Sequence, residues 1–239
     1  MPCFLSPIVA RWVALAGLVV PLSIVRAGEE KPIEPINGID LSGWKTKGEA
    51  SKSHWTLGKA SPKPADPAQL EVAPGGKELI NGAAGGVDIY TEQKFGDVHV
   101  ELEVMVPKGS NSGIYLSGEY EIQVLDSLGK EPPTQQDMGA IYGVSAPKVN
   151  AAKQPGEWQK FEIDFLAPRF EGDKRTAAAR FAKVVLNGQT IQENVEMLAP
   201  TPGGLTGKEA VTGPLLLQGD HGAIAYRNLK ITPRSAEGK

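Results

Sequence analysis

The stretch Asp97–Val106 reads DVHVELEVMV and alternates apolar with mostly polar residues over ten positions. On a β-strand, successive side chains point to opposite faces, so this alternation gives one apolar and one polar face. One face would carry Val98, Val100, Leu102, Val104 and Val106, and the other would carry His99, Glu101, Glu103 and Met105. A helix would spread both sets around its surface. The stretch therefore predicts a strand with one side on a core and the other in water.

Further apolar runs of strand length follow along the chain at spacings typical of a β-sandwich. They are Gly113–Leu116, Tyr120–Leu125, Trp158–Leu166, Phe181–Leu186, Pro214–Gln218 and Ile224–Ile231. Asn187-Gly188, between two apolar runs, predicts a tight hairpin turn. No segment shows a long apolar stripe at helical spacing. We therefore predict an all-β fold, a two-sheet antiparallel jelly-roll sandwich.

Three stretches between these runs are rich in Pro, Gly, Lys or other charged residues, and the sequence predicts long loops there. They are Gly58–Gly76, Asp126–Met138 and Ala167–Ala179. Loops of this length in a compact domain are usually either functional or disordered.

The first residues have the three parts of a secretory signal. Arg11 is the leading cation, Trp12–Val25 is an uncharged and mostly apolar run of 14 residues, and Val25-Arg26-Ala27 offers a cleavage site. A membrane-spanning helix needs about 20 apolar residues, so this run is too short. We predict a cleaved signal peptide over 1–27, a flexible leader over 28–37, a single β-sandwich domain over 38–234 and a tail over 235–239. The protein would then be periplasmic or secreted.

Cleavage after Ala27 would remove Cys3, the only cysteine, and would leave no thiol for a disulfide or for thiolate chemistry. Loss of the two arginines in the signal would change the formal net charge from −3 to −5. An acidic chain without a basic patch is not expected to bind nucleic acid. No polybasic run favours a membrane surface after cleavage. The sequence leaves the oligomeric state open.

The segment Tyr120–Asp126, YEIQVLD, is the first candidate site. A strand here would place Glu121 and Gln123 on one face and Ile122 on the other. Asp126 would join Glu121 only through a bulge. A carboxylate beside an amide suits hydrogen bonding to sugar hydroxyls, although the solvated outer face of a strand would show the same pattern.

Two turns carry further polar side chains. Ser110–Gly113 presents Asn111 next to a small polar residue and a glycine, which is also consistent with an ordinary turn. Leu217–Gly222 presents Gln218 and His221 after an apolar run. Histidine titrates near neutral pH and can act as acid or base, but a polar turn residue explains His221 equally well.

His99, Glu101 and Glu103 share one face of the predicted strand and could form a metal-like cluster. Alternating charge on the wet face of a strand is the simpler explanation. We therefore predict no metal site and no cofactor, while assistance by a divalent cation stays open.

Seven short motifs follow one another in an order that resembles the 3-keto-disaccharide hydrolase domain family. They are Leu41–Trp44, Asn111–Tyr115, Tyr120–Asp126, Gly139–Gly143, Pro155–Trp158, Leu186–Gly188, and Leu217-Gln218 with Tyr226–Asn228. The resemblance covers roughly Ile39 to Pro233. It implies a concanavalin-like jelly roll related to laminarinase-type glycosidases, acting on glycosides whose sugar carries a ketone at C3. This chain has one residue more between Gln218 and His221 than the usual turn of the family.

The resemblance also bears on mechanism. Laminarinase-type enzymes carry Glu-x-Asp-x-x-Glu on the comparable strand, where this chain has Glu121, Gln123 and Asp126. Retaining hydrolysis needs two carboxyl groups about 5–5.5 Å apart, and aspartate is one methylene shorter than glutamate. A C3 ketone instead acidifies the hydrogen at C2. A base can remove that hydrogen, the C1 group then leaves by elimination, and water adds to the enone.

Under this hypothesis, the protein is a carbohydrate-active enzyme that cleaves 3-keto-glycosides, with Glu121 and His221 as its acid/base pair. The other candidates would contact an oligosaccharide or glycoside substrate: Asn111, Gln123, Asp126 and Gln218 by hydrogen bonds, Tyr142 and Trp158 by stacking, and Arg227 by stabilising an enolate or by pairing with Glu121. A non-catalytic, lectin-like carbohydrate-binding module is the alternative, because the same fold serves binding proteins. A cell-surface interaction domain without a sugar ligand is a third hypothesis.

Overall fold

The computed structural model describes Met1 and residues 31–234. Apart from a short 3₁₀ turn at Ala50–Lys52, the regular elements of this part of the chain are β-strands. They form two large antiparallel sheets and one small hairpin. The structure confirms the predicted all-β, two-sheet antiparallel jelly-roll sandwich. Within the described residues, no helix is long and apolar enough to cross a membrane.

The smaller of the two large sheets has five strands. Its order is β1 (Trp44–Lys47), β4 (Asp88–Thr91), β13 (Leu216–Leu217), β6 (Asn111–Leu116) and β7 (Tyr120–Leu125). Strands far apart in sequence are therefore neighbours, because β13 lies between β4 and β6 and pairs with both.

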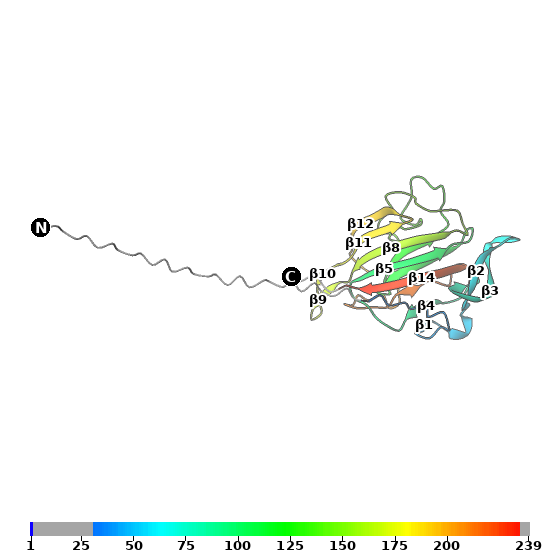
Figure 1. Ribbon diagram of the computed structural model, residues 1–239, viewed down its shortest axis with the longest axis horizontal. Coiled ribbons are helices and arrows are strands. Elements are labelled where there is room, and N and C mark those ends of the chain that lie inside the picture. Colours follow the sequence, from blue (N-terminus) through cyan, green and yellow to red (C-terminus); the bar gives the residue numbers. More distant parts are fainter. Residues whose placement is uncertain (2–30, 235–239) are drawn as a thin grey trace.

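The larger sheet has seven strands, and Figure 1 shows several of them side by side. Its order is β12 (Gln189–Met197), β11 (Ala179–Leu186), β8 (Trp158–Leu166), β5 (Val98–Met105), β14 (Ile224–Pro233), β3 (Asp66–Asn81) and β2 (Trp55–Lys63). The turn at Asn187-Gly188 joins β11 to β12 with positive φ at both residues, as a tight hairpin requires.

The main core fills the space between the two sheets. Val100 of β5 is fully buried there, as are Ile114 of β6 and Ile122 of β7. The rings of Tyr120 and Phe165 meet across the two sheets with their centroids 5.6 Å apart. The apolar face predicted for the Asp97–Val106 stretch is thus the core face, and each sheet keeps a second face that points away from this core.

Two of the three predicted long loops contain hairpins instead. Most of Gly58–Gly76 belongs to β2 and β3, and Ala167–Ala179 contains β9 (Arg169–Glu171) and β10 (Lys174–Ala177). The β2–β3 hairpin extends past the body of the protein in Figure 1, and its Ala60 and Leu70 pack against Met105 on the outer face of the large sheet. A strand at the sheet edge tolerates proline, which explains why Pro62 misleads a prediction from sequence. Asp126–Met138 contains no strand and is a loop, as predicted.

The described part of the predicted flexible leader packs on the domain. Ile33 and Ile231 exchange two backbone hydrogen bonds of 2.8 Å each. The indole N–H of Trp44 donates to the carbonyl oxygen of Pro35 at 3.1 Å. Residues 31–37 are therefore part of the folded domain. The predicted signal peptide and tail lie outside the described residues.

Candidate active site

The outer face of the five-stranded sheet carries the predicted acidic strand. Strand register places Tyr115 of β6 directly opposite Glu121 of β7, and Gly113 opposite Gln123. Ile122, between the two polar residues, points into the core. The strand phase predicted for Glu121 and Gln123 is thus confirmed.

A pocket of about 200 Å³ lies on this face. It is lined by Asn111, Tyr115, Glu121, Gln123, Tyr142, Pro202, Gly203, Gln218 and His221. Six of these residues are ones that the sequence singled out, and they come from four separate segments of the chain. The fold therefore brings the predicted acid/base pair, Glu121 and His221, into one pocket with three amide side chains.

Glu121 is the buried acid of this pocket, with only 3% of its surface exposed. Burial raises the pKa of its carboxyl group to about 7, and the negative charges of Asp88 and Asp220 act in the same direction. A hydrogen bond from Tyr115 and the nearby His221 oppose this rise. A carboxyl group with this pKa can change its protonation state near neutral pH, which suits an acid or a base.

Gly113 makes room for the Glu121 carboxylate. A Cβ atom at position 113 would lie 2.8 Å from Cε2 of Tyr115 and closer still to Oε1 of Glu121. Any side chain here would displace one of the two polar residues. The turn predicted for Ser110–Gly113 is wrong, because Asn111, Ser112 and Gly113 belong to strand β6, and Gly113 is needed there for the space that it leaves.

Tyr115 is a pocket residue that the sequence reasoning missed. Its hydroxyl group hydrogen-bonds to Glu121, and the carbonyl oxygen of Pro202 lies 3.3 Å from the same hydroxyl as an alternative acceptor. Burial raises the pKa of the Tyr115 phenol above its ordinary value, so the group stays protonated and acts as a donor. The hairpin between the two apolar runs at Gly113–Leu116 and Tyr120–Leu125 was the available signal, because pairing these runs places Tyr115 opposite Glu121.

His221 is held in the pocket by a well-anchored loop. The buried Asn81 side chain donates from Nδ2 to the carbonyl oxygens of Gly219 and Gly222, at 2.9 and 2.8 Å. The backbone N–H of Gly219 donates to Oδ1 of Asp88 at 3.0 Å. Nδ1 of His221 contacts the Asp220 carboxylate, which orients the ring. His221 lines the pocket although its loop is one residue longer than the usual turn of the resembling family.

Tyr142 reaches the pocket because its segment runs along the edge of β7. The backbone N–H of Tyr142 donates to the carbonyl oxygen of Glu121 at 3.2 Å, and that of Gln123 donates to Ala140 at 2.9 Å. The Gln123 side chain also donates to the backbone carbonyl of Gln136, at 3.2 Å. The loop after β7 thus forms one wall of the pocket.

Three of the predicted site residues lie elsewhere. Asp126 accepts a hydrogen bond of 2.9 Å from the backbone N–H of Gly109 and does not line the pocket. Trp158 and Arg227 belong to the seven-stranded sheet, where the guanidinium group lies 4.0 Å from the centroid of the indole ring. Arg227 pairs with Glu103 at 2.6 Å, so the expected pairing with Glu121 is wrong. The position of Arg227 gives no support to a role at the enolate.

The outer face of β5 does not gather its acidic and histidine side chains around one point. His99 contacts Asp164 at 2.6 Å, and Glu103 binds Arg227. Among the described residues, no group of three His, Cys, Asp or Glu side chains is placed to hold a metal ion. The alternating charge of this face is that of a wet strand surface.

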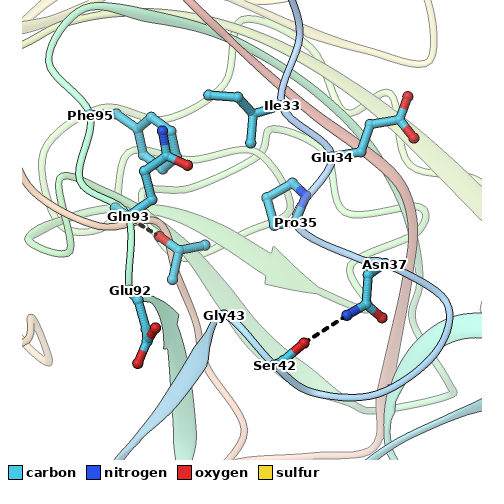
Figure 2. A pocket seen from close by; sticks show the side chains of 10 residues that line it. Ile33, Glu34, Pro35, Asn37, Ser42, Gly43, Glu92, Gln93 and Phe95 are labelled. Carbon is cyan, nitrogen blue, oxygen red and sulfur yellow. Dashed lines mark hydrogen bonds between the residues drawn. The ribbon is translucent and has the colours of Figure 1, made fainter.

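A larger cavity, about 510 Å³, lies at the other edge of the five-stranded sheet, between the N-terminal segment and the end of β4 (Figure 2). Its polar groups are engaged locally: Asn37 donates to Ser42 and Asp40, and Thr91 donates to the carbonyl oxygen of Gln93. The smaller pocket is therefore the better candidate site, because it combines a buried acid with converging polar side chains.

The fold and the pocket together define a jelly-roll protein that holds a buried acid in a pocket on the outer face of one sheet. The family model for the 3-keto-alpha-glucoside-1,2-lyase-like domain matches residues 31–232. The chain belongs to this family, as the order of its motifs predicted.

Two solved structures from Parabacteroides distasonis ATCC 8503, both described as candidate glycosyl hydrolases, are similar to this chain. One is 30% identical to this chain and has a TM-score of 0.65. The match covers 85% of this chain and 84% of the chain in that structure. The other is 17% identical and has a TM-score of 0.58, and the match covers 85% of this chain and 94% of the chain in that structure. At this identity, the likeness shows the fold alone. A comparison with curated proteins gave no significant match. The family and the first of these structures support a carbohydrate-active role.

Proposed function

We propose that this protein cleaves the glycosidic bond of 3-keto-glycosides by base-assisted elimination or hydrolysis, with Glu121 and His221 as the acid/base pair. The observation that carries the proposal is the buried Glu121, with its pKa raised to about 7, in one pocket with His221 and three amide side chains. Membership of a family named for 3-keto-glucoside lyase chemistry supports the same substrate class.

The pocket favours elimination over retaining hydrolysis. Glu121 is the only carboxylate among the residues that line it, whereas retaining hydrolysis needs a second carboxyl group about 5–5.5 Å away. In the elimination, the Glu121 carboxylate takes the proton from C2, and the electrons of the C–H bond form the C1–C2 double bond as the C1–oxygen bond breaks. His221 gives a proton to the departing oxygen. Addition of water across the new double bond then yields the free keto-sugar.

Each amide of the pocket has a suitable task. Asn111, Gln123 and Gln218 offer donors and acceptors to sugar hydroxyls or to the keto oxygen, where negative charge develops once C2 loses its proton. Tyr115 orients Glu121, and Tyr142 offers an aromatic wall to the sugar ring. We further propose that the mature protein acts in the periplasm or outside the cell, where oxidised sugars from the surroundings arrive.

The test incubates the purified mature protein with 3-keto-trehalose or an aryl 3-keto-glucoside and follows release of the aglycone, with and without a chelator. We expect Glu121→Gln to lower kcat/KM by about 10²- to 10⁴-fold, because general acid–base catalysis contributes that much. The wild-type kcat/KM should rise with pH through about 7, since the base must be ionised. Deuterium at C2 should slow release if C–H cleavage limits the rate.

The matched control is Glu101→Gln, which removes one carboxylate from the outer face of the other sheet. It should leave turnover unchanged. Full turnover by Glu121→Gln would contradict the assignment of the base. Sugar binding without any product would favour the lectin-like alternative. If the protein shows no sugar binding and no product, the hypothesis of an interaction domain without a sugar ligand is favoured.

A further inference from the structure

Lys47 and Asp88 lie on the two strands at the edge of the five-stranded sheet, outside the lining of the pocket. Register places them opposite each other on β1 and β4, and their charged groups are 3.2 Å apart. Asp88 is 6% exposed, so its charge is almost fully removed from water. A buried carboxylate needs a cation and hydrogen-bond donors, and Lys47 supplies the cation.

Each member of this pair also holds one wall of the pocket. The ammonium group of Lys47 donates to the carbonyl oxygen of Gly203 at 2.6 Å. Oδ1 of Asp88 accepts the backbone N–H of Gly219 at 3.0 Å. Gly203 is a lining residue on one side, and Gly219 adjoins Gln218 in the loop of His221 on the other.

Gly203 in turn lies against the Tyr115 side chain of the pocket. A Cβ atom at this position would lie 2.7 Å from the Tyr115 hydroxyl group, so the backbone of Gly203 lies directly over that group. Tyr115 hydrogen-bonds to Glu121. A continuous set of contacts therefore runs from Lys47 through Gly203 and Tyr115 to Glu121, and a second runs from Asp88 through Gly219 to the His221 loop.

We propose that Lys47 and Asp88 form a positioning pair that holds the two flanking walls of the pocket at a fixed separation, and thereby sets the spacing between Glu121 and His221. This inference rests on the proposed function for its catalytic consequence, but its structural content does not. Lys47 and Asp88 touch no substrate in this scheme. They act through Gly203, Tyr115 and Gly219.

The first test needs no substrate and uses carboxyl-¹³C NMR of Glu121 and amide exchange of Gly219 in the mature chain. The titratable groups that face Glu121 are Tyr115 from β6, His221 and Asp220 from the loop after β13, and Asp88 from β4. Asp88→Ala should lower the Glu121 titration midpoint and speed Gly219 exchange by at least about tenfold, because it removes a charge and a charged acceptor. Lys47→Met should raise the midpoint, because it leaves the Asp88 charge without its cation.

Lys45→Met is the matched control. Lys45 lies on the same strand two residues earlier and pairs with Glu92 at 3.3 Å, with both side chains more than half exposed. Lys45→Met should leave the Glu121 titration midpoint and the Gly219 exchange rate as in the wild type. Lys47→Arg should keep both quantities at their wild-type values. The proposal is overturned if Lys47→Met and Lys45→Met give the same Glu121 midpoint, or if Asp88→Ala leaves Gly219 exchange unchanged.

The second test uses the 3-keto-glycoside and separates this inference from the proposed function. Lys47→Met should lower kcat/KM by about tenfold or more, because small misplacements of catalytic groups cost about that much. Lys47→Arg should recover most of this loss. If the wild type releases no aglycone, the proposed function fails, while the NMR measurements still decide whether the pair positions the pocket.

Discussion

Glu121 illustrates at the level of one residue how burial couples protonation to folding. Its ordinary pKa of 4.5 is raised to about 7, first by burial and then by Asp88 and Asp220. Between these pH values the folded chain keeps a proton that the unfolded chain has released. Stability therefore falls as pH rises through this range. The contribution of Glu121 is fully present below pH 4.5 and is lost as pH rises through about 7.

Glu121→Gln should flatten this dependence, because glutamine imitates the protonated acid at every pH. Between about pH 5 and about pH 8, the wild type should lose up to about 3 kcal/mol that the variant keeps, at about 1.4 kcal/mol per unit of pKa shift. Urea unfolding of both proteins across this range measures the difference. Equal pH slopes for the two proteins would show that Glu121 is not the titrating group.

Two features of the sequence were enough to predict pocket residues: the phase of a strand and the position of a turn. The phase of YEIQVLD places Glu121 and Gln123 together, and the turn after an apolar run places His221 at a sheet end. The failures at Trp158 and Arg227 share one physical cause. Alternation tells which face of a strand a side chain occupies but not which sheet the strand joins. Arg227 therefore looked like a partner for Glu121 although its strand belongs to the other sheet.

At the level of elements, β14 shows which contacts Arg227 makes outside the pocket. The pairing of β14 with β5 shifts between Arg227 and Lys230, and Asn228 has a φ of 53°. This bulge lets two consecutive residues bind Glu103: Arg227 at 2.7 Å through Nε and Asn228 at 3.0 Å. The guanidinium group also stacks on Trp158.

Arg227→Met should therefore lower stability and leave catalysis intact. We expect a loss of about 1–3 kcal/mol, because the change removes a charged hydrogen bond to Glu103 and a cation–π contact. Lys230→Met, on the same strand and exposed, serves as the control and should have little effect. Denaturant unfolding and kcat/KM measure the two consequences separately. A large fall in kcat/KM without a loss of stability would return Arg227 to the list of catalytic candidates.

Strands with strong alternation were predictable from sequence, and the β2–β3 hairpin was not. β7 and β8 begin and end where their apolar runs do. The hairpin instead buries only a few small or isolated apolar side chains on the outer face of the sheet, Ala60 and Leu70 among them. Such weak alternation among prolines and glycines cannot be told from a loop until Met105 is known to lie beneath it.

At the level of the whole molecule, the segment before β1 contacts both large sheets. The backbone of Ile33 pairs with Ile231 near the end of β14, and Pro35 accepts the indole N–H of Trp44. A chain that starts at residue 38 loses these contacts. It should be less stable than a chain that starts at residue 31 by about 2–4 kcal/mol, at about 1 kcal/mol per hydrogen bond plus lost apolar contact. Thermal unfolding of the two chains measures this, and equal midpoints would show that the segment is a dispensable leader.

The register of the five-stranded sheet decides where a change of chain length would disturb the candidate site. Each strand contributes to the outer face at alternate positions, so a residue gained or lost within β6 or β7 would turn Tyr115 or Glu121 toward the core. The same change in a connecting loop leaves the strand register as it is and alters only the length of a wall of the pocket. The sheet therefore fixes Glu121 opposite Tyr115, whereas the loops can vary in length without moving this pair.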